Sequence, residues 1–293
     1  MSESPSLLIL SDGTLIPQSE LGGAAVNRAM RLGDGFFETV RVIRGRPHAW
    51  EAHHARITAC FKALGLEPQP HVDSTFLLRS IYRLMEAYGA QHARVRLTFF
   101  RKGGGAYTPE TDRPGFIGEC MPLAKGDFQV RQEGVHLGLY TTLKKYRSPL
   151  APFKLLGNHV YIQAASWAAK HHYDDALICN DAGEIIESTC SNLFTFSEGA
   201  LHTPPLSSGC VGGVMRMSVL NAAMEAGIPC FETRLSEADI LRAEEVWLTN
   251  AVQGISWVRS FRDKRFFHKA ADRITGLLNT RHAERAEEVS AAE

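Results

Sequence analysis

Residues 36–44, FFETVRVIR, form the stretch that decides the fold of the first part of the chain. β-Branched and aromatic side chains dominate it, and residues of this kind favour extended backbone. Gly45 interrupts the run, and Arg46 to Trp50 can return beside it as the second arm of a hairpin. The stretch therefore predicts a strand at 36–44 with a turn immediately after it.

Helical patterns follow this strand. Apolar residues recur at helical spacing in two runs, and a glycine closes each run. Asp73 or Ser74 stands where the second run needs an N-cap. The predicted elements are helices at 51–64 and 73–88 and strands at 94–100 and 115–121. Strands and helices mixed in this way predict an α+β arrangement.

A connector, Pro122 to Asp127, is predicted to end this first part because it contains Pro, Lys, Gly and Asp. Beyond it, strand and helix patterns alternate. The predicted elements are strands at 134–140, 175–180, 184–187 and 192–196 and helices at 155–170, 214–227, 236–242 and 268–280. We therefore expect an α/β protein with a small N-terminal α+β domain (1–121), a connector (122–127), a larger C-terminal α/β domain (128–280) and a flexible tail (281–293).

The composition excludes several classes of function. The 293 residues include 32 Lys plus Arg and 32 Asp plus Glu, so the chain lacks the basic excess of a general nucleic-acid binder. No apolar run has the length of a membrane span, and the N-terminus lacks the basic start of a signal peptide. The six cysteines form no Cys-x-x-Cys pair, and no His-Glu-x-x-His occurs. We expect a cytoplasmic protein with free thiols and no metal site.

Lys154 has an unusual setting for a lysine, because apolar residues flank it in APFKLLG (151–157). An apolar environment lowers the pKa of an ammonium group, which is what a lysine that forms an imine requires. The alternative is a lysine at a helix start whose stem lies along apolar surface. Lys144 and Lys145 form the competing candidate, but adjacent ammonium groups among polar residues are expected to be solvated.

Two further features are candidates for ligand binding. Glu187 ends a strand-like run and precedes small hydroxyl residues, although a turn residue is the alternative. The loop 207–213 contains three glycines and opens a helix at Val214, so its free N–H groups can form an anion site. It matches neither the Walker loop nor the dinucleotide fingerprint, and a flexible loop remains the alternative. Other candidates for anion binding are Arg56, Arg94, Arg96 and Arg101.

Taken together, the segments resemble the fold-type IV (class IV) pyridoxal-phosphate enzymes. That family contains branched-chain aminotransferases, D-amino-acid aminotransferases and aminodeoxychorismate lyases. The matching segments occur in the family's order and cover about residues 25–255. They are Asn27-Arg28, Gly33 to Thr39, His53 to Arg56, Lys154, Glu187, Ser191 to Phe194, His202 to Pro204, Gly209 to Arg216 and Thr249 to Ala251.

The resemblance implies pyridoxal 5′-phosphate as cofactor and a role for each matched residue. Lys154 would form the internal aldimine and move the proton at the substrate carbon, by way of a quinonoid. Glu187 would pair with the pyridine nitrogen, and Arg56 would hold the phosphate with the N–H groups of Val214 and Met215. Further implied cofactor contacts are Ser191, Asn192, Asn250 and Ala251, and implied substrate contacts are Phe37, Thr39, Arg94, Arg96 and Tyr107. A homodimer acting on small amino acids and 2-oxo acids is also implied.

Departures from the family's patterns bear on the subfamily. Branched-chain aminotransferases carry Tyr where this chain has His159, and Thr where it has Met215 and Ala251. The Tyr near residue 30 and the Arg-x-His motif of D-amino-acid enzymes are replaced by Met30 and the 94–96 stretch Arg-Val-Arg. We expect an aminotransferase. The alternatives are an aminodeoxychorismate lyase, which releases 4-aminobenzoate and pyruvate, and a non-catalytic relative that binds a small molecule.

Overall fold

The computed structural model describes residues 7–20 and 27–292. The chain divides into two compact units. The first unit comprises Met1–Gly126 and Phe153–Gly157, and the second comprises Asp127–Pro152 and Asn158–Glu293. The short segment Phe153–Gly157 thus belongs to the first unit, and it contains Lys154. The predicted domain ranges assigned this segment to the C-terminal domain.

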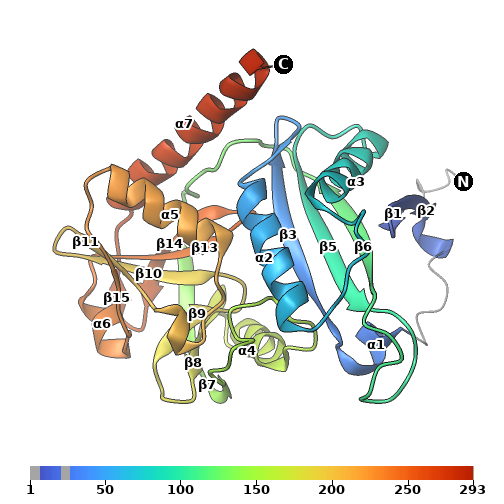
Figure 1. Ribbon diagram of the computed structural model, residues 1–293. Coiled ribbons are helices and arrows are strands. Elements are labelled where there is room, and N and C mark those ends of the chain that lie inside the picture. The colour runs from blue at the N-terminus through green and yellow to red at the C-terminus, as the bar shows by residue number, and fades with distance from the viewer. Residues whose placement is uncertain (1–6, 21–26, 293) are drawn as a thin grey trace, which may run out of the picture. The chain divides into compact units, whose positions relative to one another are not determined.

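A six-stranded antiparallel sheet forms the first unit, with strands in the order β2-β1-β6-β5-β3-β4 (Figure 1). The long central strands are paired residue by residue, so that Thr39 of β3 lies opposite Arg96 of β5. The strands are β1 (Leu8–Ser11), β2 (Thr14–Pro17), β3 (Gly35–Ile43), β4 (Arg46–Pro47), β5 (Ala93–Arg101) and β6 (Pro114–Pro122), and the helices are α1 (Arg28–Leu32), α2 (Trp50–Ala63) and α3 (Ser74–Ala87).

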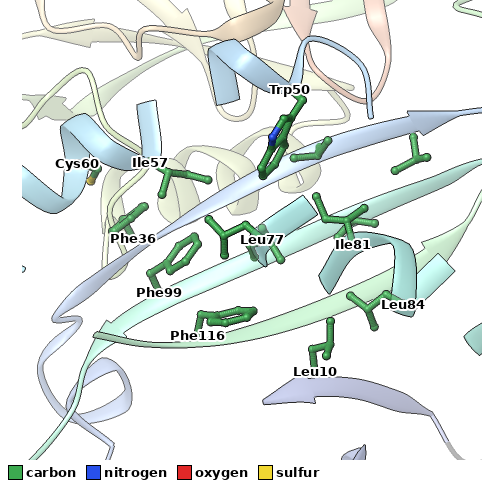
Figure 2. Packing of buried hydrophobic residues seen from close by; sticks show 14 of the residues in the cluster. Leu10, Phe36, Trp50, Ile57, Cys60, Leu77, Ile81, Leu84, Phe99 and Phe116 are labelled. Carbon is green, nitrogen blue, oxygen red and sulfur yellow. The ribbon is translucent and has the colours of Figure 1, made fainter. Parts of the chain in front are cut away.

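The core of the first unit lies between one face of this sheet and the helices α2 and α3. Alternate residues of β5 are fully buried, as the two-residue period of a strand requires. Figure 2 shows the resulting cluster, in which Phe36 and Phe99 are stacked with ring centroids 4.9 Å apart. On the opposite face, Phe37 of β3 and Arg94 and Arg96 of β5 are partly buried, whereas Thr39 and Arg41 of β3 are buried.

The second unit contains a nine-stranded mixed sheet in the order β12-β11-β10-β13-β14-β7-β8-β9, with β15 beside β14. Because β9 also pairs with β10, the strands from β10 round to β9 form a closed ring. The strands are β7 (Val135–Lys145), β8 (Asp175–Asn180), β9 (Ile185–Ser188), β10 (Asn192–Ser197), β11 (Ala200–Thr203), β12 (Cys230–Glu232), β13 (Glu245–Asn250), β14 (Gly254–Phe261) and β15 (Lys264–Arg265).

Helices of the second unit cover the strands from outside and connect them. Helix α4 joins the parallel strands β7 and β8 and packs on both of them. Helix α6 begins with a capping box formed by Ser236 and Asp239. The helices are α4 (His159–Lys170), α5 (Val214–Glu225), α6 (Glu237–Arg242) and α7 (Lys269–Ala292). In the described part of the chain, no helix has the length and apolar character to cross a membrane.

The structure differs from the sequence prediction in several elements. The helix expected at 155–170 begins at His159, because Phe153–Gly157 is non-helical and joins the first unit. The strands β13 and β14 were not predicted. Residues 281–292 have helical backbone as the end of α7, and the flexibility expected for 281–293 stays a prediction.

Candidate functional site

Glu187 lies where the ring of strands closes, with its Cα opposite that of Asn192. Its side chain is buried and accepts hydrogen bonds from three donors. Lys145 Nζ and Tyr161 Oη lie 2.8 and 2.7 Å from Oε1, and the backbone N–H of Val211 lies 2.8 Å from Oε2. A buried carboxylate with this many donors is held in one orientation. The turn residue considered as an alternative is excluded, because Glu187 lies within β9.

Lys145 corrects one prediction. Lys144 is exposed as expected, but Lys145 is buried and its ammonium binds Glu187 and the carbonyl oxygen of Ala151, 3.0 Å away. The pairing of β7 with β8 shifts register between Tyr140 and Lys145, so the burial of Lys145 does not follow from simple strand alternation. Lys145 is therefore the counter-ion of Glu187 and not a candidate for imine formation.

Tyr161 is a second residue that the sequence analysis did not identify. It lies on the face of α4 that also carries the buried residues Ala164 and Ala168, at i, i+3 and i+7. Burial, followed by the neighbouring Glu187 carboxylate, raises the pKa of the phenol well above its ordinary value. The phenol therefore stays protonated and donates to Glu187. The sequence signal available for it was a polar tip on an apolar helical stripe.

The glycine loop before α5 is attached to the same strands. Val211 donates its N–H to Glu187, and its carbonyl oxygen accepts from Asn192 Nδ2 at 2.7 Å. Gly213 is the N-cap of α5, and a Cβ at this position would overlap with the side-chain oxygen of Asn192. Since the N-cap residue is a glycine and has no side chain to cap the helix, the first N–H groups, at Val214 and Met215, suit an anion.

Ser191, Asn250 and Ala251 lie at the ends of neighbouring strands. Asn250 Nδ2 donates to Ser191 Oγ at 3.0 Å, and Asn250 Oδ1 accepts from the backbone N–H of Gln253 at 2.8 Å. Ala251 lies in the turn that this second bond stabilises. Thr249, opposite Asn192 in the sheet, is buried, and its hydroxyl has no hydrogen-bond partner among residues 7–20 and 27–292. A buried hydroxyl without a partner is costly unless a ligand or water satisfies it.

Lys154 lies in the first unit and is half-buried. Its carbonyl oxygen accepts from the N–H of Phe37 at 2.9 Å, and its Nζ lies 4.7 Å from the centroid of the Phe37 ring. The guanidinium carbon of Arg96 lies 3.9 Å from the same centroid. Lys154 is five residues before α4, so the alternative of a lysine at a helix start is wrong. The Phe37 ring thus contacts two cations, each through its π-electrons.

The predicted substrate residues of the first unit share one face of its sheet, the face away from α2 and α3. Phe37 and Thr39 are two residues apart on β3, and Arg94 and Arg96 are two residues apart on the paired strand β5. Residues at this spacing point to the same face of a sheet. Burial lowers the pKa of Arg96, although Glu119 acts in the opposite direction. Arg96 Nε donates to Thr98 Oγ1 at 3.2 Å.

Arg56 lies on the other side of that sheet, on α2, and binds Glu38 of β3. Arg56 Nε donates to Glu38 Oε2 at 2.9 Å, and His53 Nδ1 lies 3.0 Å from Oε1. Burial alone would raise the pKa of Glu38, but Arg56 and His53 together hold it well below its ordinary range. The predicted phosphate contact therefore comes from an arginine whose guanidinium is already oriented by a buried carboxylate.

The contacts of Glu38 with Arg56 and His53 predict how the free energy of unfolding changes at acid pH. Because the folded pKa of Glu38 is depressed, its contribution to the free energy of unfolding is present above the ordinary carboxyl range and lost as the pH falls. Glu38→Gln should lower the free energy of unfolding by about 3 kcal/mol at neutral pH. This difference from the wild type should shrink as the pH falls from about pH 5 to pH 2. Denaturant unfolding at several pH values measures the difference. Glu119→Gln, at an exposed carboxylate, is the matched control; a constant difference at all pH values would contradict the assignment.

Tyr107 has a different environment from the other predicted substrate residues. Its side chain is 90% exposed, in the loop that follows β5. Arg28 anchors this loop by donating to the carbonyl oxygens of Gly104 and Ala106, at 3.0 and 2.7 Å, while its Nε pairs with Asp34 at 2.8 Å. Tyr107 is therefore an exposed side chain on a loop that the buried guanidinium of Arg28 holds in place.

The second unit has the donors and acceptors for a ligand with two distinct ends. The uncapped start of α5 suits an anionic group. The Glu187 carboxylate suits a protonated ring nitrogen, and the Thr249 hydroxyl is a buried polar atom still without a partner in the described chain. The first unit has a half-buried lysine at Lys154 and an arginine at Arg96 against one aromatic ring. Such residues suit imine formation and carboxylate binding.

Comparison with known proteins agrees with this chemistry. The family described as "Amino-transferase class IV" matches residues 35–261. An aminodeoxychorismate lyase of Vibrio harveyi is 27% identical, over 87% of this chain and 94% of its own length. A D-alanine aminotransferase of Bacillus licheniformis is 23% identical, over 93% and 94%. The structure of the branched-chain aminotransferase of Thermoproteus uzoniensis with norvaline has a TM-score of 0.83 and 20% identity, covering 93% of each chain. That of Thermobaculum terrenum, similar at a TM-score of 0.80, is in its PLP form.

Proposed function

The chain belongs to the class IV aminotransferases, and on that premise we propose that it is a pyridoxal-phosphate-dependent enzyme that moves an amino group between an amino acid and a 2-oxo acid. Its fold is the mixed α/β fold of the fold-type IV enzymes, as the sequence predicted. The observation that carries the proposal is the buried Glu187 carboxylate, held by three donors beside the uncapped start of α5.

Each end of the cofactor has a group in this chain that suits it. Pyridoxal phosphate, when bound, supplies an aldehyde that condenses with amines and a ring that withdraws electrons from the reacting carbon. Glu187 would accept the N–H of the ring nitrogen and keep that nitrogen protonated. Arg56 and the N–H groups of Val214 and Met215 would bind the phosphate. Ser191, Asn192, Asn250 and Ala251 are the remaining proposed cofactor contacts.

Lys154 and the face of the first sheet would serve the substrate. The Nζ of Lys154 would form the imine and then hold and move the proton at the substrate carbon. Arg96 would bind the carboxylate that amino acids and 2-oxo acids share, and Phe37 orients both cations through its ring. Thr39, Arg94 and Tyr107 stay predicted substrate contacts.

A spectroscopic panel of amino donors tests the proposal. The purified chain is loaded with pyridoxal phosphate and mixed with single L- and D-amino acids, without an amino acceptor. We expect at least one amino acid to convert the cofactor band to that of the amine form, and a 2-oxo acid to reverse the change. Lys154→Ala, under the same conditions, should give neither change. A protein that stays colourless with added cofactor would contradict any cofactor-dependent activity and favour a non-catalytic binding protein.

A lyase that eliminates pyruvate from aminodeoxychorismate is the second candidate, because the Vibrio harveyi lyase is 27% identical along nearly its whole length. The two reactions need the same lysine and carboxylate and differ in what leaves the substrate. Including aminodeoxychorismate in the panel separates them: production of 4-aminobenzoate with no half-reaction by any amino acid would replace the first proposal with the second. The homodimer and the cytoplasmic location stay predictions.

A further inference from the structure

Glu187 has one hydrogen-bonding position left. A carboxylate offers about four lone-pair positions to donors. Lys145 and Tyr161 both donate to Oε1, while Val211 alone donates to Oε2. Within the described residues, the position that remains open is therefore on Oε2, the oxygen that accepts from the glycine loop. The three donors orient the carboxylate toward a fourth.

Lys145 supplies the charge in this arrangement. Its side chain and that of Glu187 are almost completely buried, with exposed fractions of 6% and 3%. The ammonium also binds the neutral carbonyl oxygen of Ala151 and lies 5.3 Å from the centroid of the Tyr161 ring. Within residues 7–20 and 27–292, Glu187 is the carboxylate with which it forms an ion pair. Burial opposes an isolated carboxylate strongly, so without Lys145 the side chain of Glu187 would take up a proton.

We propose that Lys145 is a positioning residue that keeps Glu187 ionised before the cofactor binds, so that the carboxylate is ready to accept the N–H of a protonated ring nitrogen. This inference rests on the proposed function. Tyr161 shares the orienting role but carries no charge. Lys145 acts through Glu187 and does not take part in bond formation.

The proposal predicts how many protons are exchanged with the solvent when pyridoxal phosphate binds to the chain. In the wild type, an ionised Glu187 and a protonated ring nitrogen form the carboxylate–pyridinium pair with no proton exchanged with the solvent. In Lys145→Met, a protonated Glu187 and a protonated ring nitrogen form the same pair only after one proton has been released to the solvent. Binding should therefore take up about one proton fewer in the variant than in the wild type at neutral pH. Protons exchanged by the phosphate and by Lys154 are common to both and cancel in the difference.

Calorimetric titration with pyridoxal phosphate, in buffers of different ionisation enthalpy, measures this number. The full chain is compared with Lys145→Met, Lys145→Arg and Tyr161→Phe. We expect Lys145→Met to bind about one proton fewer than the wild type on titration and Lys145→Arg to match the wild type, because arginine keeps the positive charge. Tyr161→Phe should weaken binding without changing the proton number. Equal proton numbers in the wild type and Lys145→Met would overturn the inference.

Thermal unfolding without added cofactor provides a second measurement. In Lys145→Met the folded carboxyl should bind a proton more tightly than the unfolded one. Its stability relative to the wild type should therefore fall as the pH rises above the ordinary carboxyl range. The double variant Lys145→Met with Glu187→Gln removes both charges and should recover stability, even where the single variant fails to fold. A double variant no more stable than Lys145→Met would overturn the ion-pair role.

The two measurements separate this inference from the proposed function. A wild-type chain that acquires no absorbance band with pyridoxal phosphate would overturn the proposed function, and this inference with it. A wild-type band together with equal proton numbers in all variants would overturn the inference alone. A band, a proton number lowered only in Lys145→Met, and recovery in the double variant would support both.

Discussion

Lys154→Arg should lower turnover by about 10³-fold or more, because the residue that forms the imine and moves the proton is then missing. Arginine keeps the charge and the approximate length of lysine, but its guanidinium does not lose its proton at accessible pH and cannot condense with an aldehyde. Single-turnover measurements with the best amino donor give the loss. Borohydride reduction of the wild type, followed by peptide mapping, should place the pyridoxyl label on Lys154.

Two other lysines provide controls for this result. Lys144→Arg, at an exposed position on β7, should leave turnover unchanged. Lys145 is buried as the partner of Glu187 and should carry no label after reduction. Turnover near the wild-type rate in Lys154→Arg would remove Lys154 from the reaction, and a label on Lys145 would exchange the roles of the two residues.

Glu187→Gln should affect both catalysis and stability. The amide has the same shape but cannot keep a ring nitrogen protonated, so turnover should fall by about 10²-fold or more. The change also leaves the buried Lys145 ammonium without its carboxylate, which should lower the free energy of unfolding by about 3 kcal/mol. Steady-state kinetics and denaturant unfolding measure the two effects.

Glu184→Gln is the matched control for that variant. Glu184 precedes the same strand, β9, but its Oε2 accepts from Asn180 and Ser208, each at 2.7 Å, and no proposed cofactor contact binds it. Its replacement should leave turnover essentially unchanged. If Glu187→Gln also kept full turnover and the wild-type free energy of unfolding, the carboxylate would have neither the catalytic nor the ion-pair role.

Local sequence patterns predicted most of the first unit. The strand at 36–44 and the helices at 51–64 and 73–88 correspond to β3, α2 and α3 within one or two residues. Such agreement is expected because periodic burial and caps are properties of neighbouring residues. The segment 155–170 was predicted less well, because its first residues join the other unit.

Two candidates for the site were recognisable without the fold. Lys154 stood among apolar residues and Glu187 at the end of a strand, and each signal is local. The partner of Arg56 was not recognisable. Glu38 is 18 residues away in sequence, and only the packing of α2 on β3 brings the two side chains together.

The sequence by itself determined the family, the order of the main elements and the residues proposed to perform the chemistry, because these depend on residue type and short spacing. Only the tertiary structure decided what holds Glu187 in place. Lys145 reaches it across a register shift and Tyr161 from a helix. Val211 reaches it from a glycine loop, after strands distant in sequence have closed into a ring. Contacts of this kind depend on long-range strand pairing and on the burial of charge, and neither property is contained in a local pattern.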